Sequence, residues 1–121
     1  MTMRELEVSV RDRDGIAVID LTGDVNSSAE AALDAAYDEA VARGATEIAL
    51  NFNDVDYINS TGIALIVGLL ARARKTGIGV RAFGLSEHYR SIFEITRLAD
   101  FLAINPDEDS AVRGAEGNTN A

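Results

Sequence analysis

The chain has 121 residues, enough for one domain built around one hydrophobic core. Hydrophobic residues make up 47% and charged residues 26%, a composition typical of a folded globular protein. The formal net charge of −9 would repel nucleic acid and anionic membranes, so we expect neither as a partner. With no cysteine and a single histidine, we expect no metal site and no cofactor.

The sequence contains no segment typical of membrane insertion or secretion. The longest apolar stretch, residues 62–71, has about half the length that a transmembrane helix needs. The first ten residues alternate charged and apolar side chains and lack the apolar region of a signal peptide. We therefore expect a cytoplasmic protein.

The first half of the chain predicts a hairpin followed by a helix. Apolar residues alternate with polar ones in 6–10, turn-forming residues follow in 12–15, and a second extended segment begins at Ile16. The pattern from Ser27 to Glu30 fits a capping box, and apolar residues then recur at helical spacing until Gly44.

The second half alternates strands and helices. We expect strands at 48–52, 78–83 and 101–104, a polar turn at 53–56, a helix at 61–75 and a further helix capped by Ser86. The resulting order, ββαβαβαβ, predicts a single α/β domain over residues 1–105 with a mixed, mostly parallel sheet. Residues 106–121 are mainly small, polar and acidic, and we expect a disordered C-terminal tail.

The predicted helix at 61–75 is unusually apolar. Between Ile63 and Ala71 its apolar residues occupy nearly the whole circumference, and cations appear only in its last turn. Such a helix is either buried on several sides or presents an apolar patch to a partner. The acidic excess lies in the first sixty residues, whereas residues 61–104 carry a net positive charge, a separation that suits a protein-binding surface.

Motifs for catalysis are absent. The Gly-x-Ser-x-Gly pattern does not surround Ser60, and no glycine-rich phosphate-binding motif occurs. His88 is expected to be a solvated residue near the start of a helix. Asp54 and Asp56 could form an acid pair or a metal site, but carboxylates in a polar turn usually serve the turn itself. We therefore expect no catalytic residue.

Ser60 is the most informative polar residue, because it precedes the most apolar helix. One interpretation is that its side chain caps the helix by accepting a backbone N–H. The other is phosphorylation, since a phosphate there would meet free N–H groups and the positive end of the helix dipole. The two interpretations are compatible.

Three segments resemble the STAS family of anti-sigma factor antagonists. Residues 57–65, Tyr-Ile-Asn-Ser-Thr-Gly-Ile-Ala-Leu, resemble the family's phosphorylation segment, in which an apolar pair and Asp-Ser-Ser/Thr-Gly precede an apolar helix. Residues 21–26 resemble its Leu-x-Gly-acid-apolar-Asp loop, and residues 83–86 with 98–104 resemble its closing segment. The likeness extends from about Leu6 to Ile104.

The resemblance implies a regulatory protein that is not itself an enzyme. Unphosphorylated, it would bind an anti-sigma factor that is also a serine kinase of the GHKL ATPase type and so free a sigma factor or another effector. The kinase would phosphorylate Ser60 and the complex would separate, until a PP2C-type phosphatase restores the binding form. The expected partner-binding residues are Asp24, Asn26, Ser27, Asn59, Ser60, Thr61, Gly62 and Ile63.

Two positions depart from the family pattern. Asn59 and Asn26 stand where the family usually has aspartate. Asparagine keeps the hydrogen-bonding shape and the turn preference of aspartate but removes the negative charge. Two other functions stay open: a constitutive STAS subunit of a transporter or signalling complex that is not phosphorylated, and a small enzyme or nucleotide binder that uses the Ser60 loop.

Overall fold

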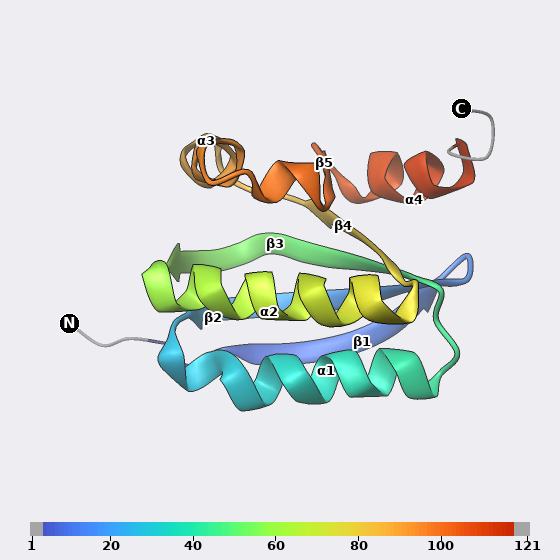
Figure 1. Cartoon of the computed structure of the whole chain (residues 1–121), viewed down its shortest axis with the longest axis horizontal. Coiled ribbons are helices and arrows are strands. Elements are labelled where there is room, and N and C mark those ends of the chain that lie inside the picture. Colours follow the sequence, from blue (N-terminus) through green and yellow to red (C-terminus); the bar gives the residue numbers. More distant parts are fainter. Residues whose placement is uncertain (1–3, 118–121) are drawn as a thin grey trace.

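The computed structural model describes residues 4–117 and shows one α/β domain (Figure 1). Its strands are β1 (Glu7–Arg13), β2 (Ile16–Val25), β3 (Glu47–Ile58), β4 (Gly79–Phe83) and β5 (Ala103–Asn105). Its helices are α1 (Glu30–Ala42), α2 (Ser60–Thr76), α3 (Glu87–Ile95) and α4 (Glu108–Gly117), with short 3-10 helices η1 (Ser27–Ala29) and η2 (Leu98–Asp100).

The five strands form a single mixed sheet in the order β1-β2-β3-β4-β5. Strands β1 and β2 are antiparallel, and each later strand pairs parallel with its predecessor. The predicted hairpin and the predicted ββαβαβαβ order are thus confirmed. Asp14 and Gly15 turn the hairpin with φ of 54° and 86°, the left-handed conformation that tight hairpin turns favour.

Alternating residues of the central strands serve two different faces of the sheet. On one face Ile19, Leu50 and Ala82 join the main hydrophobic core beneath α1, α2 and α3. Phe93 of α3 is fully buried there and meets the Phe52 ring edge-on, with centroids 5.9 Å apart. Much of the apolar surface of α2 is therefore buried against this face of the sheet.

Helix α4 covers the opposite face of the sheet. It is formed by residues that the sequence led us to expect in a disordered tail. Ala111 and Val112 of this helix are buried against Ile16, Val18 and Phe83. The expectation of disorder is wrong for residues 108–117, because two apolar side chains suffice to close a patch that the sheet would otherwise expose. Residues 118–121 lie outside the described part of the chain.

The start of α4 carries a capping signal that composition alone concealed. Asp107 accepts a hydrogen bond from the Ser110 N–H at 2.8 Å, and Glu108 and Asp109 occupy the first helical turn. Aspartate is a favoured capping residue, and acidic side chains stabilise a helix N-terminus. The acidity that suggested disorder is thus compatible with the start of a helix.

Ion pairs join α4 to β1. Glu108 accepts hydrogen bonds from Arg11 at 2.6 Å and from Arg13 at 2.8 Å, and Arg11 also pairs with Asp20 of β2 at 2.7 Å. The hydrogen bond from Arg11, supported by Arg13, lowers the pKa of Glu108 to about 2. The ionised form of Glu108 therefore favours the docked helix.

This pairing predicts a pH-dependent stability. A lowered pKa in the folded state contributes stability above the ordinary value of 4.5, and the contribution is lost as the pH falls toward about 2. Glu108→Gln should cost about 1 kcal/mol at neutral pH, with the difference from the original protein closing in acid. Urea unfolding at a series of pH values measures this. Glu94→Gln, an exposed change on α3, is the control, and a Glu108→Gln deficit that persists unchanged at pH 2 would contradict the assignment.

Strand β3 differs from the expected strand and turn. Residues 53–56 continue the strand, because Asp54 pairs with Thr22 and Val55 with Gly23 of β2 beyond a register shift. Strand β4 pairs with β3 only as far as Asn51, so the end of β3 projects as a two-stranded extension with β2.

Across residues 4–117, no helix has both the length and the apolar character needed to cross a membrane.

Candidate functional site

Two chain segments meet at one end of the sheet. There β2 leads into η1 and β3 leads into α2, and the beginnings of α1 and α2 lie at the same end of the molecule (Figure 1). Val25 pairs with Ile58 at the last register position, and the Asn59 N–H donates to the Val25 carbonyl at 3.2 Å. The segments matched to the two family loops are therefore adjacent in space.

Gly62 permits this close approach. A Cβ atom at Gly62 would lie 2.0 Å from the Val25 carbonyl oxygen, a separation that two non-bonded atoms do not reach. Any side chain there would push the first turn of α2 away from β2. The glycine of the Ser-Thr-Gly sequence thus acts through the space it leaves to a neighbouring backbone.

Asn59, rather than Ser60, caps α2. Its side-chain oxygen accepts the Gly62 N–H at 2.8 Å, and its carbonyl accepts the Ile63 N–H at 2.9 Å. The interpretation of Ser60 as the cap is therefore wrong, because asparagine is at least as good a capping residue and stands one position earlier. Ser60 is the first helical residue and is exposed. Within the described residues, no hydrogen bond engages its hydroxyl.

The neighbouring loop is held by two buried polar side chains. Asp24 accepts a hydrogen bond from the Arg4 N–H at 3.0 Å, and Asn26 accepts both the N–H and the hydroxyl of Ser28. Asp24 is 7% exposed and Asn26 is 6% exposed. Asn26 is thus the N-cap of η1, and the expected capping box starting at Ser27 is not formed. Both side chains position the loop from within.

The exposed part of the site is small and carries several hydroxyl groups. Ser27, Ser60 and Thr61 are exposed, Ile63 is half-buried, and Tyr57 lies 50% exposed at the end of β3. Their position at the junctions of β2 with η1 and of β3 with α2 makes one contiguous edge. Of the eight residues predicted from the sequence, Asp24, Asn26 and Gly62 are buried.

Sequence reasoning missed Tyr89. Its hydroxyl accepts the Ile58 N–H at 3.0 Å, which fixes the end of β3 just before the Ser60 segment. Tyr89 lies on α3, the helix that the sequence predicted after Ser86. No local pattern links position 89 to position 58, so this contact depends on the tertiary fold.

The residues considered for other chemistry do not assemble into a second site. His88, Asp54 and Asp56 are all exposed, and the Asp56 carboxylate pairs with Arg4 at 2.6 Å. In the part of the chain that the structure describes, no group of three or more acidic or histidine side chains is placed to hold a metal ion.

Comparison with known families agrees with this architecture. The family model described as the STAS domain matches residues 7–111, which is most of the chain. The chain belongs to the STAS domain family. The matched region includes both loops of the site and reaches into α4.

Curated relatives of this STAS domain share a common description. An anti-sigma-B factor antagonist of Staphylococcus aureus (strain NCTC 8325 / PS 47) is 34% identical over 62 residues, covering 51% of this chain and 57% of the relative. The match therefore spans little more than half the length of that protein. An anti-sigma-B factor antagonist of Listeria monocytogenes is 26% identical over 99 residues, covering 82% of this chain and 86% of the relative.

Solved structures share the fold at low sequence identity. An anti-sigma factor antagonist from Mycobacterium paratuberculosis superimposes with a TM-score of 0.78 and 20% identity, over 90% of this chain and 92% of the other. The Bacillus cell fate determinant SpoIIAA in its phosphorylated form gives a TM-score of 0.66 and 20% identity, over 88% and 98%. These similarities establish the STAS fold and leave function to be argued from the site.

Proposed function

We propose that this STAS domain is an anti-sigma factor antagonist controlled by phosphorylation at Ser60. In its unphosphorylated form it would bind an anti-sigma factor that is also a serine kinase of the GHKL ATPase type. A PP2C-type phosphatase would reverse the modification. In this cycle the protein is a substrate and a switch, and it contributes no catalytic group of its own.

The observation that carries the proposal is the environment of the Ser60 hydroxyl. The hydroxyl is exposed at the first position of α2, and Asn59 has taken over the capping role that would otherwise occupy it. A kinase can therefore reach the hydroxyl without unfolding the helix. The names of the curated relatives and the phosphorylated form of SpoIIAA support the same function.

The helix N-terminus also explains how a phosphate could be tolerated. A phosphate adds about −1.5 to −2 charges at pH 7, and the N-terminal end of a helix favours negative charge. Phosphorylation at Ser60 should thus leave the fold intact and act on the partner instead. The added charge would repel an acidic partner surface and would have to lose its hydration in an interface.

The first test is the position of the phosphate. Incubation with the cognate kinase and ATP should modify Ser60, because the family's modified serine directly precedes Ser/Thr-Gly. Thr61 is also exposed, so accessibility alone does not separate the two hydroxyls. Phosphopeptide mapping by mass spectrometry decides between them, and phosphate on Thr61 with none on Ser60 would refute the assignment.

A control without kinase separates the proposal from the nucleotide-binding alternative. The purified protein with ATP or GTP alone should neither bind nor hydrolyse the nucleotide. Affinity capture from the native cell extract should retain the kinase on the original protein and lose it with Ser60→Asp. Retention of the kinase by both proteins would contradict the switch.

A further inference from the structure

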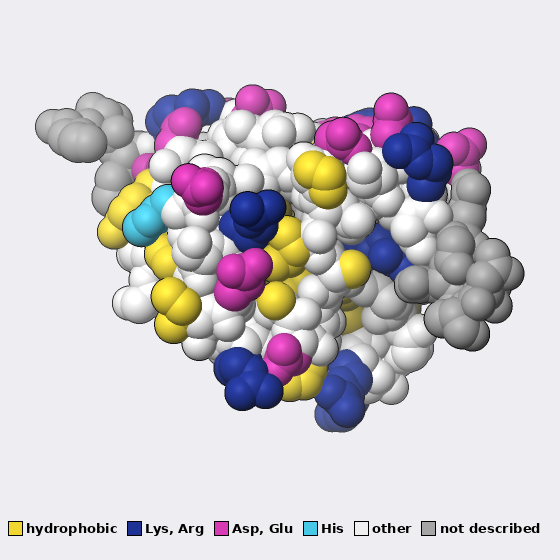
Figure 2. Space-filling view, turned by 90° about the horizontal axis from the view of Figure 1, so that it is seen from above, with side chains coloured by type: hydrophobic (Ala, Val, Ile, Leu, Met, Phe, Trp, Pro, Cys, Tyr) yellow, Lys and Arg dark blue, Asp and Glu magenta, His cyan; other side chains and the backbone are white. Residues whose placement is uncertain are grey.

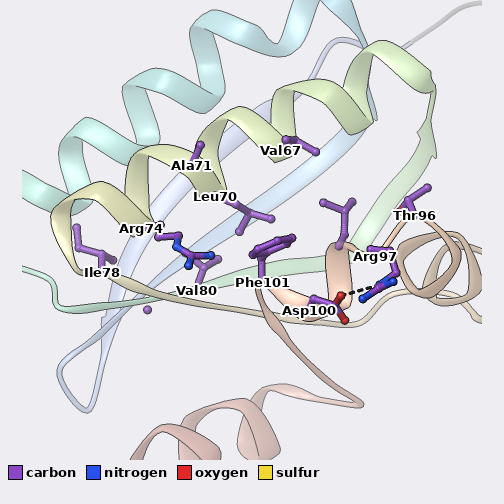
Figure 3. A pocket seen from close by; sticks show the side chains of 12 residues that line it. Val67, Leu70, Ala71, Arg74, Ile78, Val80, Thr96, Arg97, Asp100 and Phe101 are labelled. Carbon is purple, nitrogen blue, oxygen red and sulfur yellow. Dashed lines mark hydrogen bonds and ion pairs between the residues drawn. The ribbon is translucent and has the colours of Figure 1, made fainter.

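A groove with a cavity volume of about 530 Å³ lies along the C-terminal half of α2 (Figure 3). Helix α2, strand β4 and the segment around η2 form its walls. Most of the lining is apolar, and Val67 and Phe101 stand on its rim with 46% and 56% of their surfaces exposed. None of the residues expected to bind the kinase lines the groove, which is therefore distinct from the Ser60 site.

Few charged side chains line the groove, and they differ in whether they form an ion pair. Arg74 extends from α2 beside Phe101, with its guanidinium carbon 5.6 Å from the ring centroid. Among the described residues it has no carboxylate partner. Arg97 is engaged by Asp100 at 2.7 Å on the other side of Phe101 (Figure 3). One uncompensated cation therefore borders an apolar groove on a chain whose net charge is −9.

The segment opposite α2 is well anchored. Leu98 and Leu102 are 4% exposed and belong to the main core, whereas Phe101 between them points into the groove. Arg97 has a φ of 69°, a left-handed conformation that is uncommon outside glycine. The buried side chains of Leu98 and Leu102 thus anchor the segment that carries Phe101, and the groove is preformed.

The geometry points to a binding site for a small amphipathic carboxylate of the fatty-acid class. The volume falls within the range of about 300 to 1,000 Å³ typical of small-molecule sites, which combine apolar walls with a few placed polar groups. Arg74 would hold the carboxylate, and the aliphatic chain would lie against Leu70, Val80 and the Phe101 ring. Seen from above, the molecule carries scattered charges of both signs around its apolar side chains, not one broad apolar face (Figure 2).

A single cation at the mouth of a concave apolar site complements a molecule with one anionic head and an apolar tail. A protein partner would bring a flat surface of at least several hundred Å², whereas the apolar area here is recessed between three elements. The proposal is independent of the Ser60 switch, because binding in the groove can be measured on the isolated protein.

The test is a titration of the full-length protein with dodecanoate below its micelle concentration, followed by amide chemical shifts in NMR. We expect saturable shifts confined to Val67, Val80 and the 96–101 segment. Arg74→Gln should weaken binding by about tenfold or more, since it removes a charge-assisted hydrogen bond. Lys75→Gln, on the same helical turn but outside this groove, should leave the affinity within about twofold.

Two further arms make the result decisive. Ala71→Trp introduces a large side chain at an exposed position of the groove wall, so it should block binding while the protein stays folded. Dodecanol, which has the same tail without the charge, should bind at least about tenfold more weakly than dodecanoate. Equal affinities of the two compounds, or of Arg74→Gln and the original protein, would overturn the proposal.

Other occupants of the groove predict different results. If a second copy of the chain fills it, the same amide shifts will depend on protein concentration without any ligand. If a protein partner fills it, Arg74→Gln will impair capture of the kinase while dodecanoate leaves the spectrum unchanged. Either outcome would refute the fatty-acid site, and phosphopeptide mapping at Ser60 would still test the proposed switch separately.

Discussion

Ser60→Asp is expected to lose binding to the anti-sigma kinase by about 100-fold or more, whereas Ser60→Ala should bind like the original protein. A carboxylate in the contact surface must lose its hydration and face an unmatched partner, a cost of about 3 kcal/mol. Alanine removes only a hydroxyl that has no hydrogen bond among the described residues. Isothermal titration against the kinase measures both affinities.

Thermal melting separates this effect from unfolding. Because Asn59 supplies the cap, Ser60→Ala should not pay the cost of about 1 kcal/mol expected for a lost capping side chain. Ser60→Asp should be at least as stable as the original protein, since aspartate suits the first turn of a helix. The two variants should therefore differ in affinity and agree in melting behaviour.

A matched charge elsewhere tests whether the position matters. Thr46 is exposed just before β3 begins, at the opposite end of that strand from Ser60. Thr46→Asp adds the same negative charge to the protein and should leave kinase binding within about twofold. If Thr46→Asp and Ser60→Asp weaken binding equally, overall charge and not the Ser60 surface controls the interaction.

Local patterns were sufficient for the order of the elements from β1 to β5. Alternation in β1 and helical spacing in α1 follow from the need of each of these elements to bury one face. The central strands β2 and β3 are buried on both faces, and their short apolar runs between turn signals marked them as strands. The same patterns misplaced element ends where polar residues have tertiary reasons to be there. Asn53 and Asp54 look like turn residues, but both lie within β3. The strand continues because β2 pairs with it beyond the end of β4, with Asp54 opposite Thr22 after a register shift.

The sequence predicted which residues form the site but not the role of each residue in it. The sequence placed Asn59 and Ser60 together at the start of α2, but which of the two caps the helix depends on a shift of one residue. The burial of Asp24 and the reach of Tyr89 to Ile58 arise from segments distant in sequence. Local sequence patterns contain no signal for contacts between residues that are so far apart along the chain.

The largest effect on stability is expected from removing α4. A chain ending at Pro106 would expose Ile16, Val18 and Phe83, which are between 0% and 4% exposed in the intact protein. Exposing apolar side chains of this size costs about 1.5 to 3 kcal/mol for each one fully uncovered. Even partial exposure should remove about 3 kcal/mol, and the melting temperature should fall by more than about 10 °C.

A point variant tests the same contact without shortening the chain. Val112→Asp places a carboxylate in the patch between α4 and the sheet and should lower the melting temperature nearly as much as the truncation. Arg113→Asp is the control, because Arg113 directly follows Val112 but is exposed, so the change leaves the buried contact intact. Since α4 covers the face of the sheet opposite α2, both truncation and Val112→Asp should still bind the kinase at temperatures where they remain folded. Equal melting of Val112→Asp and Arg113→Asp would mean that α4 contributes little to the fold, and loss of kinase binding by folded Val112→Asp would mean that the partner surface extends to α4.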